Sequence, residues 1–364
     1  MEIRRLGIIG TGLIGASVGL AAKRAGVDHV EGYDFSENVA ETALGRGAID
    51  GIEIIADEVL ADCDFVVVAV PVIALQSVLR DVLDSADDVT ITDVGSTKSN
   101  LGDALTHANF VGGHPVTGSE AHGPEHATAD LFDGATWFLT PTAHTDPERY
   151  RLVHGFVSAL GATPVAIDPE AHDRLVALTS HLPHALANLL VNQAGAGRIE
   201  GHEPLAAAGG SLREMTRVAG ANPRIWVDIF LENTAALRGA LGEHRRRVEQ
   251  LEAALEARDA GYIARWIGEA ADNRRRLLED AFPDPGDLHQ LRVHVPDRPG
   301  VLAGITQALG AQRINIEDFE LHHVSPERGG TLTLLVTGAS EAERAVALLE
   351  SQGYGVVVSP VLGE

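Results

Sequence analysis

The segment Gly10-Thr11-Gly12-Leu13-Ile14-Gly15 constrains the fold of this 364-residue chain more than any other feature. It directly follows an apolar run at residues 6–9 and opens a stretch with helical spacing that ends near Gly26. Glycines at these positions tighten the turn and let backbone N–H groups approach a pyrophosphate, and the helix N-terminus favours its negative charge. This context predicts a dinucleotide-binding βαβ unit. The residues expected to contact the cofactor are Gly10, Gly12, Leu13, Ile14 and Gly15.

Asp34 follows the next predicted strand, in Gly32-Tyr33-Asp34, 19 residues beyond Gly15. A carboxylate at this place accepts hydrogen bonds from the ribose hydroxyls and would repel a 2′-phosphate. We therefore expect NAD and not NADP as the cofactor. The alternative is that Asp34 only caps the turn before Ser36.

The spacing of apolar residues divides the chain into three regions. Residues 3–167 alternate short apolar strands with helical segments, which predicts a mostly parallel sheet with helices on both faces. Long helices are then expected at 171–198, 205–219, 222–241 and 243–281. Residues 282–288, with two prolines and a glycine, indicate a linker, and the pattern beyond it is β-α-β-β-α-β.

The predicted fold class is therefore α/β with three domains. A Rossmann-like, doubly wound dinucleotide domain is expected at residues 1–168 and an all-helical domain at 169–282. A ferredoxin-like βαββαβ domain is expected at residues 289–364.

Charge and composition exclude several classes of partner. The 52 acidic residues outnumber the 28 basic ones, and the net charge of −24 disfavours nucleic acid and anionic lipid. The single cysteine, Cys63, excludes an intrachain disulfide. The apolar runs are shorter than the roughly 18 residues of a membrane span, so we expect a cytoplasmic protein without a membrane partner.

Two polar segments follow predicted strands and supply candidate catalytic groups. Ser96 comes after the strand at 90–94, and His114 comes after the strand at 110–112. Removing a hydride from an alcohol carbon requires a group that takes the hydroxyl proton, and a neutral imidazole suits that task. We expect His114 to be this acceptor and Ser96 to hold or orient His114. The alternative is a loop histidine that only satisfies a turn.

The helical region offers further candidates. Ser180 and His184 are predicted to share one helix face, with His181 turned aside. Arg213 and Arg217 could grip a carboxylate or could form only surface salt bridges, for example with Glu214, and the residues alone do not decide. No metal site is predicted, because Gly123 and Pro124 between His122 and His126 do not suit a zinc-binding helix.

Taken together, these motifs resemble the TyrA family, the prephenate and arogenate dehydrogenases of tyrosine biosynthesis. The resemblance runs from residue 6 to about residue 233. The matching segments are Gly10 to Gly15, Val94-Gly95-Ser96-Thr97-Lys98, Gly113-His114-Pro115 with Gly118 and Glu120, Ser180-His181-Leu182-Pro183-His184, and Thr216-Arg217 followed by Asn222-Pro223-Arg224-Ile225-Trp226-Val227-Asp228-Ile229.

The resemblance implies oxidative decarboxylation of prephenate with NAD to 4-hydroxyphenylpyruvate, carbon dioxide and NADH. It implies that His114 takes the hydroxyl proton and that Ser96 positions the hydroxyl. Arg217 and His184 would hold the two carboxylates, Ser180 would line the pocket, and Ser119 and Glu120 would line its entrance. The helical domain would form a homodimer. One departure is Glu214, where aspartate is common in the family; the longer acid could shift Arg217.

The last region resembles an ACT domain through Pro296-Asp297-Arg298-Pro299-Gly300-Val301-Leu302 and Ile314-Asn315-Ile316. Such domains usually bind amino acids where two copies meet. The resemblance implies that Asp297, Gly300 and Asn315 contact an effector, with tyrosine, the pathway product, as the natural one. The alternative is an ACT domain that only dimerises.

The sequence is also compatible in part with three rival functions. Arogenate dehydrogenase is the nearest, although His184 favours the keto acid over an ammonium group. A β-hydroxyacid-type dehydrogenase shares the architecture but would lack the Lys98 turn and the run from Ser180 to His184. A non-catalytic amino-acid sensor would not need the intact nucleotide turn and His114.

Overall fold

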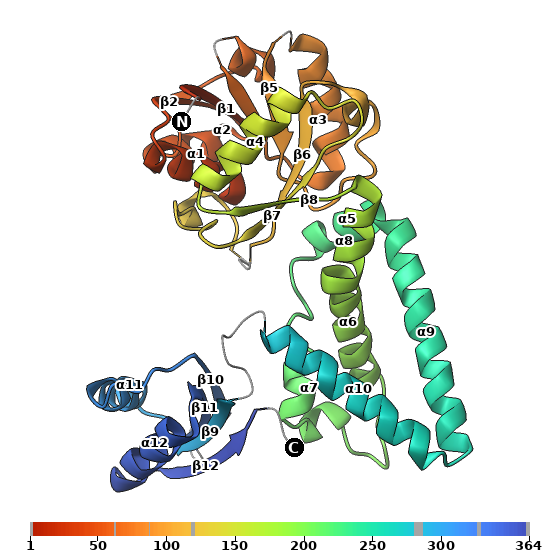
Figure 1. The fold of residues 1–364 in the computed structure, drawn as a ribbon, viewed down its shortest axis with the longest axis vertical. Coiled ribbons are helices and arrows are strands. Elements are labelled where there is room, and N and C mark those ends of the chain that lie inside the picture. Colours follow the sequence, from red (N-terminus) through yellow and green to blue (C-terminus); the bar gives the residue numbers. More distant parts are fainter. Residues whose placement is uncertain are drawn as a thin grey trace. The chain divides into compact units, whose positions relative to one another are not determined.

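The computed structural model describes residues 3–61, 63–86, 88–117, 121–279, 287–325 and 329–361. The chain divides into two compact units, Met1–Arg246 and Arg247–Glu364 (Figure 1). Helix α9 (Thr234–Glu256) runs across the boundary between them. No helix among the described residues is long and apolar enough to cross a membrane.

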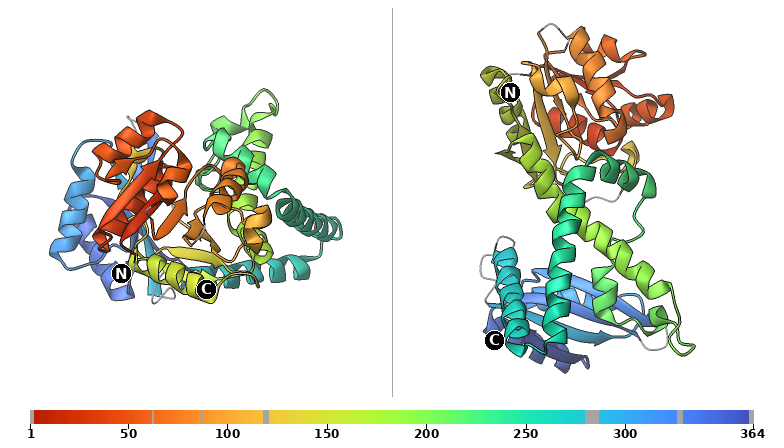
Figure 2. Two further views of the ribbon diagram at one scale, coloured as in Figure 1. Left: turned by 90° about the horizontal axis from the view of Figure 1, so that it is seen from above. Right: turned by 90° about the vertical axis from the view of Figure 1, so that its right-hand side faces the viewer.

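The first unit is built on an eight-stranded sheet, which Figure 2 shows from two further directions. Its order is β3-β2-β1-β4-β5-β6-β7-β8, and only the β6–β7 pair among these neighbours is antiparallel. The first six strands follow the order of a doubly wound dinucleotide fold, so the Rossmann-like prediction is confirmed. The strands are β1 (Arg5–Ile9), β2 (His29–Tyr33), β3 (Gly51–Ile52), β4 (Phe65–Val68), β5 (Thr90–Asp93), β6 (Phe110–Pro115), β7 (Thr136–Thr140) and β8 (Thr163–Ala166).

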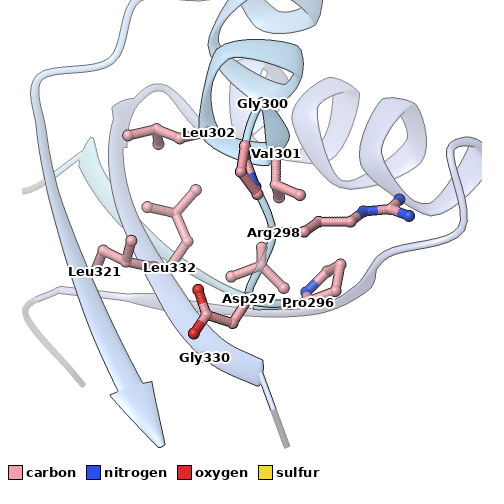
Figure 3. A pocket seen from close by; sticks show the side chains of 11 residues that line it. Pro296, Asp297, Arg298, Gly300, Val301, Leu302, Leu321, Gly330 and Leu332 are labelled. Carbon is pink, nitrogen blue, oxygen red and sulfur yellow. The ribbon is translucent and has the colours of Figure 1, made fainter. Parts of the chain in front are cut away.

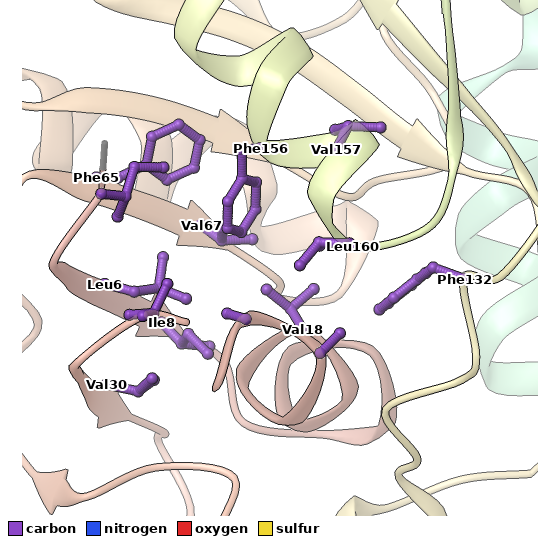
Figure 4. Close-up of a cluster of buried hydrophobic side chains, with 14 of the residues drawn as sticks. Leu6, Ile8, Val18, Val30, Phe65, Val67, Phe132, Phe156, Val157 and Leu160 are labelled. Carbon is purple, nitrogen blue, oxygen red and sulfur yellow. The ribbon is translucent and has the colours of Figure 1, made fainter. Parts of the chain in front are cut away.

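Apolar side chains form a buried cluster on each face of this sheet. Phe65 and Val67 of β4 face one cluster, whereas Val66 and Val68 face the other. The first cluster joins the strands to α1 (Leu13–Arg24) and α4 (Pro147–Ala159), and Phe156 of α4 lies against Phe65 (Figure 4). The second cluster joins them to α3 (Val72–Ser85). Helix α2 (Glu37–Gly45) follows β2.

The helical region begins at Asp168, whose side chain accepts the Ala171 N–H and caps α5. Its helices are α5 (Pro169–Val176), α6 (Leu182–Gly195), α7 (Gly210–Met215), α8 (Pro223–Glu232) and α9, and α10 (Ala260–Glu279) follows in the second unit. A π-helical turn, η4 (Ala177–His181), joins α5 to α6. Short 3₁₀ turns are η1 (Ala56–Leu60), η2 (Gly102–Thr106), η3 (Pro124–His126) and η5 (Pro204–Ala207).

Three of the predicted long helices are interrupted. The helix expected at 243–281 begins earlier, within α9, and breaks at Arg258, which has a φ of 51° in the left-handed region. Asp259 then accepts the Tyr262 N–H at 2.9 Å and starts α10. The helix expected at 205–219 is only η5 and α7, and the one at 222–241 breaks at Asn233. Residues 282–286 of the predicted linker lie outside the described residues.

The second unit contains α10 and a four-stranded antiparallel sheet with the order β10-β11-β9-β12. Its elements are β9 (Leu288–Val295), α11 (Val301–Ala311), β10 (Asp318–Ser325), β11 (Gly329–Thr337), α12 (Ala339–Ser351) and β12 (Gly355–Pro360). Leu291 and Val293 of β9 pack with Ile305 of α11 and Leu349 of α12 in one apolar core. The predicted βαββαβ arrangement is confirmed.

Candidate active site

The glycine turn lies where β1 ends, beside the end of β4. Gly10 has a φ of 95°, and a Cβ added there would lie 2.5 Å from the Ala69 carbonyl oxygen. A Cβ on Gly15 would lie 1.9 Å from the Gly10 carbonyl oxygen, so only glycine fits both positions. A Cβ on Gly12 would meet nothing within 4 Å, and the first residues of α1, Leu13 and Ile14, are only partly buried. The turn thus offers an accessible helix N-terminus that suits a pyrophosphate.

Asp34 is held against this turn. Its Oδ2 accepts the Thr11 N–H at 2.8 Å, and its Oδ1 accepts the Ser36 N–H at 2.9 Å. The turn contact with Ser36 that was the alternative role is therefore present. The Asp34 carboxylate can still accept further hydrogen bonds, because each of its oxygens has two lone pairs. Asp34 lies at the end of β2, beside the glycine turn, where a ribose hydroxyl could donate to it.

Ser96 and His114 are carried by adjacent parallel strands. Strand β5 pairs with β6 in the register Thr92↔Val111; Ser96 follows β5, and His114 lies near the end of β6. The Oγ atom of Ser96 is buried and has no hydrogen-bond partner within the described residues. A buried hydroxyl without a partner costs stability and is typical of a group that is completed by a ligand.

A fully buried ion pair lies at the base of the Ser96 loop. Lys98 Nζ contacts Asp93 Oδ2, and neither side chain is exposed. Asp93 also accepts the Gly95 N–H at 2.8 Å and the Gly113 N–H at 3.0 Å. Burial lowers the pKa of Lys98, and the Asp93 carboxylate opposes that shift. Removing one partner of such a pair typically costs about 3–5 kcal/mol, so the pair stabilises the Ser96 loop. The Gly113 N–H, which donates to Asp93, links this loop to β6.

Among the described residues, His114 has a hydrogen-bond partner on one side of its ring and none on the other. Its Nδ1 lies 2.9 Å from His172 Nε2, and its Nε2 makes no hydrogen bond within the described part of the chain. Burial, together with the nearby His172 and Lys98, holds the pKa of His114 well below its ordinary value. The ring is therefore neutral near pH 7, and this form can accept a proton.

His114 belongs to a buried hydrogen-bond network, and several of its members were not predicted from the sequence. His172 and Asp173 lie on α5, and the Asn233 amide donates to the Asp173 carbonyl oxygen at 2.9 Å and lies 3.1 Å from His181 Nδ1. The only local signal was an adjacent His-Asp pair early in a capped helix.

Ser180 and His184 do not share one helix face in the structure, although the sequence predicted that they would. Ser180 is exposed, whereas His181 and His184 are 2% and 4% exposed. The cause is the π-helical turn η4, whose wider turn shifts the side chains around the helix axis. His184 stacks on Trp226, with ring centroids 3.5 Å apart and an interplanar angle of 7°. His181, expected to turn aside, instead joins the buried network.

Arg217 follows α7 and is exposed, and its side chain makes no hydrogen bond or ion pair with any described residue. The salt bridge with Glu214, which was the alternative role for Arg217, is therefore absent from the described residues. Asn188 links this segment to α6, because its amide donates to the His184 carbonyl oxygen at 2.9 Å and its Oδ1 accepts the Gly220 N–H at 3.4 Å. The segment that carries Arg217 is thus joined to α6, the helix of His184, through Asn188.

Two predicted entrance residues, Ser119 and Glu120, lie outside the described residues. Among the residues that are described, no group of three or more potential ligands could hold a metal ion.

His181 gives a pH-dependent prediction. Burial lowers its pKa from 6.5 to about 4, although Asp173 opposes the shift. Between these values the unfolded chain binds more protons than the folded one, so stability is lost as the pH falls. From pH 7 to pH 4.5 this residue should account for about 2–3 kcal/mol of the lost unfolding free energy.

We expect His181→Asn to lose correspondingly less stability over this interval than the wild type. Denaturant unfolding can be followed by tryptophan fluorescence, since the Trp226 ring lies 6.2 Å from the His181 ring. His154→Asn, at an exposed position of α4, should show the wild-type pH dependence. Equal pH dependence in all three proteins would contradict the assignment.

The second unit has a cavity of about 280 Å³ in front of α11 (Figure 3). Asp297 and Gly300, two predicted effector contacts, line it, and Gly300 has a φ of 87° at the start of the helix. Leu321 and Leu332 provide an apolar wall. The third predicted contact, Asn315, is not among the lining residues and donates to Glu317 Oε1 at 2.9 Å.

Three family models match the chain in order. Residues 18–166 match the nucleotide-binding domain of prephenate dehydrogenase, and residues 168–269 match its dimerization domain. Residues 289–353 match the ACT domain.

Curated relatives and solved structures agree with these matches. The chain is 32% identical to prephenate dehydrogenase of Bacillus subtilis over 95% of both chains. It is 33% identical to cyclohexadienyl dehydrogenase of Zymomonas mobilis over 76% of this chain and 97% of the relative.

A crystal structure of prephenate dehydrogenase from A. aeolicus, in complex with hydroxyphenyl propionate and NAD+, is similar with a TM-score of 0.71 and 28% identity. That match covers 76% of this chain and 99% of the A. aeolicus chain. Arogenate dehydrogenase of Synechocystis gives a TM-score of 0.68 at 28% identity, over 75% of this chain and 99% of the other. Together with the glycine turn and the Ser96, His114 and Arg217 segments, these matches show that this chain belongs to the prephenate dehydrogenase family.

Proposed function

We propose that this protein is an NAD-dependent prephenate dehydrogenase that converts prephenate to 4-hydroxyphenylpyruvate and carbon dioxide. The observation that carries the proposal is the placement of two groups on neighbouring strands. His114 Nε2, at the end of β6, and the Ser96 hydroxyl, on the loop after β5, both have no hydrogen-bond partner among the described residues. Membership of the family and the NAD+ bound in the A. aeolicus crystal structure support the same substrate and cofactor.

The reaction needs few protein groups, because forming an aromatic ring drives the loss of carbon dioxide. NAD, when bound at the glycine turn, supplies the hydride acceptor. His114 Nε2 takes the proton from the ring hydroxyl, and Ser96 Oγ orients that hydroxyl by a hydrogen bond. The neutral state of His114 is the one that this step requires.

Arg217 and His184 are proposed to hold the two carboxylates of the substrate. Arg217 offers a planar fork of N–H donors with no partner among the described residues. His184 is fixed by its stack on Trp226 and lies on the helix to which the Arg217 segment is tied. Ser180, exposed on η4, is proposed to line the outer pocket, with Ser119 and Glu120 at the entrance.

The experiment that tests this function is an NADH absorbance assay with prephenate and with arogenate, each with NAD and with NADP. We expect turnover to be fastest with prephenate and NAD. Faster turnover of arogenate would make the protein an arogenate dehydrogenase, and no NADH from either substrate would overturn the proposal.

Replacing Asp34 by alanine is expected to weaken the preference for NAD over NADP. The carboxylate beside the Thr11 N–H would no longer bind the ribose hydroxyls or repel a 2′-phosphate. The measurement is the ratio of kcat/KM for NAD to that for NADP. If the ratio does not change, Asp34 serves only the turn with Ser36.

We also propose that the cavity of the second unit binds tyrosine and that the protein is a homodimer. The match to an ACT domain supports a small-molecule effector, and the match to a dimerization domain supports the dimer. The alternative, an ACT domain that only dimerises, predicts no response of the enzyme to tyrosine. A cytoplasmic location stays a prediction from the sequence.

Tyrosine is expected to change the rate of the wild-type enzyme and to have a weaker effect on Asp297→Ala, because Asp297 lines the cavity. The check is the NADH assay over a range of tyrosine concentrations, with the exposed Asp318→Ala of β10 as a control. A wild-type rate that is indifferent to tyrosine would leave the domain with only an assembly role.

A further inference from the structure

A line of three side chains runs from His114 into the protein interior. His114 Nδ1 lies 2.9 Å from His172 Nε2, and His172 Nδ1 lies 2.8 Å from Asp173 Oδ1. His172 and Asp173 are 0% and 2% exposed. Both side chains are therefore closed to solvent.

Asp173 sets the direction of these hydrogen bonds. Although burial alone would raise it, bonds from His172, Ser99 and the Lys98 N–H leave the pKa of Asp173 below its ordinary value. The group is therefore a carboxylate, and a carboxylate only accepts. His172 Nδ1 must then carry a hydrogen and donate it to Asp173.

The tautomer of His114 then follows from the protonation of His172. A neutral His172 that is protonated at Nδ1 has a lone pair at Nε2, so His114 Nδ1 must donate to it. This leaves the lone pair of His114 on Nε2. If His172 were instead doubly protonated, its Nε2–H would donate to His114 Nδ1, and neutral His114 would carry its hydrogen on Nε2, where it could not accept a proton.

We propose that His172, held by Asp173, is a positioning residue that selects the Nδ1–H tautomer of His114 and orients its Nε2 toward the substrate hydroxyl. The inference rests on the proposed function for its kinetic consequence but not for the tautomer. When His114 Nε2 takes the hydroxyl proton, the ring becomes an imidazolium. The line through His172 to the Asp173 carboxylate then stabilises this positive charge in a buried place.

His172 is a better target for a test than Asp173. The Asp173 carboxylate also accepts the Lys98 and Ser99 N–H groups, so its replacement would disturb the Ser96 loop. His172 contacts His114, Asp173 and, edge to face, the Phe138 ring. Phenylalanine keeps a ring at this position but no acceptor, whereas the side-chain oxygen of glutamine can replace His172 Nε2 as the acceptor of the His114 Nδ1–H.

The first test reads the tautomer without any turnover. In ¹⁵N-histidine-labelled enzyme at pH 8, the His114 signals can be assigned by their loss in His114→Gln. We expect Nδ1 to be protonated and Nε2 unprotonated in the wild type, and this state to be lost in His172→Phe. Wild-type His114 protonated at Nε2 would overturn the inference, whether or not the protein oxidises prephenate.

The second test is kinetic. We expect His172→Phe to lower kcat by about 10²-fold, with little change in the KM for NAD, and His172→Gln to recover part of the loss. His154→Phe, at an exposed position of α4, is the matched control and should keep the wild-type kcat. If His172→Phe is folded by its melting temperature and keeps kcat within about twofold, His172 has only a packing role. If His172→Phe does not fold, the protonation state of His114 in the wild-type ¹⁵N spectrum and the kcat of His172→Gln still test the proposal.

Discussion

His114→Ala is expected to lower kcat with prephenate by about 10²–10⁴-fold while the affinity for NAD stays nearly unchanged. The variant removes the Nε2 lone pair that accepts the hydroxyl proton, and this group lies at the end of β6, apart from the glycine turn that follows β1. The nucleotide site and the chemistry are therefore separable by this one substitution.

The measurement is steady-state kinetics of NADH formation, with NAD binding followed by fluorescence titration. His154→Ala, an exposed histidine of α4, is the control for loss of an imidazole elsewhere in the same unit. The melting temperature of both variants should be recorded, since His114 also contacts His172. Turnover equal to the wild type would refute the assignment of His114 as the proton acceptor.

Arg217→Ala is expected to raise the KM for prephenate by about 10²-fold or more, with a smaller effect on kcat. A charge-assisted bond between a guanidinium and a carboxylate contributes about 3 kcal/mol, which corresponds to this factor. Because Arg217 is exposed and has no described partner in the protein, its replacement should leave folding unchanged.

Arg213→Ala is the matched control, since Arg213 is also an exposed arginine, one helical turn earlier, and should leave the KM near the wild-type value. Arg217→Lys keeps the charge but loses the two-pronged geometry, so an intermediate KM is expected. A KM for Arg217→Ala that matches the Arg213→Ala value would remove Arg217 from the carboxylate role.

The fold could be predicted from the sequence because its signals are local. The glycine turn, the alternating strands and the βαββαβ order each lie within short segments whose spacing is informative. The helix break at Arg258 could not be predicted, because nothing in its neighbours marks an arginine for the left-handed region. The π-helical turn likewise changed which of His181 and Ser180 is buried.

The site was predictable only in part for a different reason. Ser96 was predicted to follow one strand and His114 the next, and the carboxyl ends of parallel strands meet at one edge of a sheet, so their closeness could be anticipated. The structure pairs these strands and extends β6 through His114 to Pro115. His172 lies 58 residues from His114 along the chain, and the contact between them depends on how α5 packs against the sheet. Tertiary packing of this kind leaves no mark in the residue pattern.

The central claim is that His114 Nε2 meets the hydroxyl of a bound cyclohexadienol opposite the nicotinamide. A crystal structure of this protein with NAD and a hydroxyphenyl product analogue tests it most directly. We expect the analogue's hydroxyl within about 2.6–3.2 Å of Nε2, with Ser96 Oγ bonded to the same oxygen. An analogue bound with its hydroxyl beyond the reach of His114, or an imidazole that faces solvent with no pocket between it and the coenzyme, would contradict the claim.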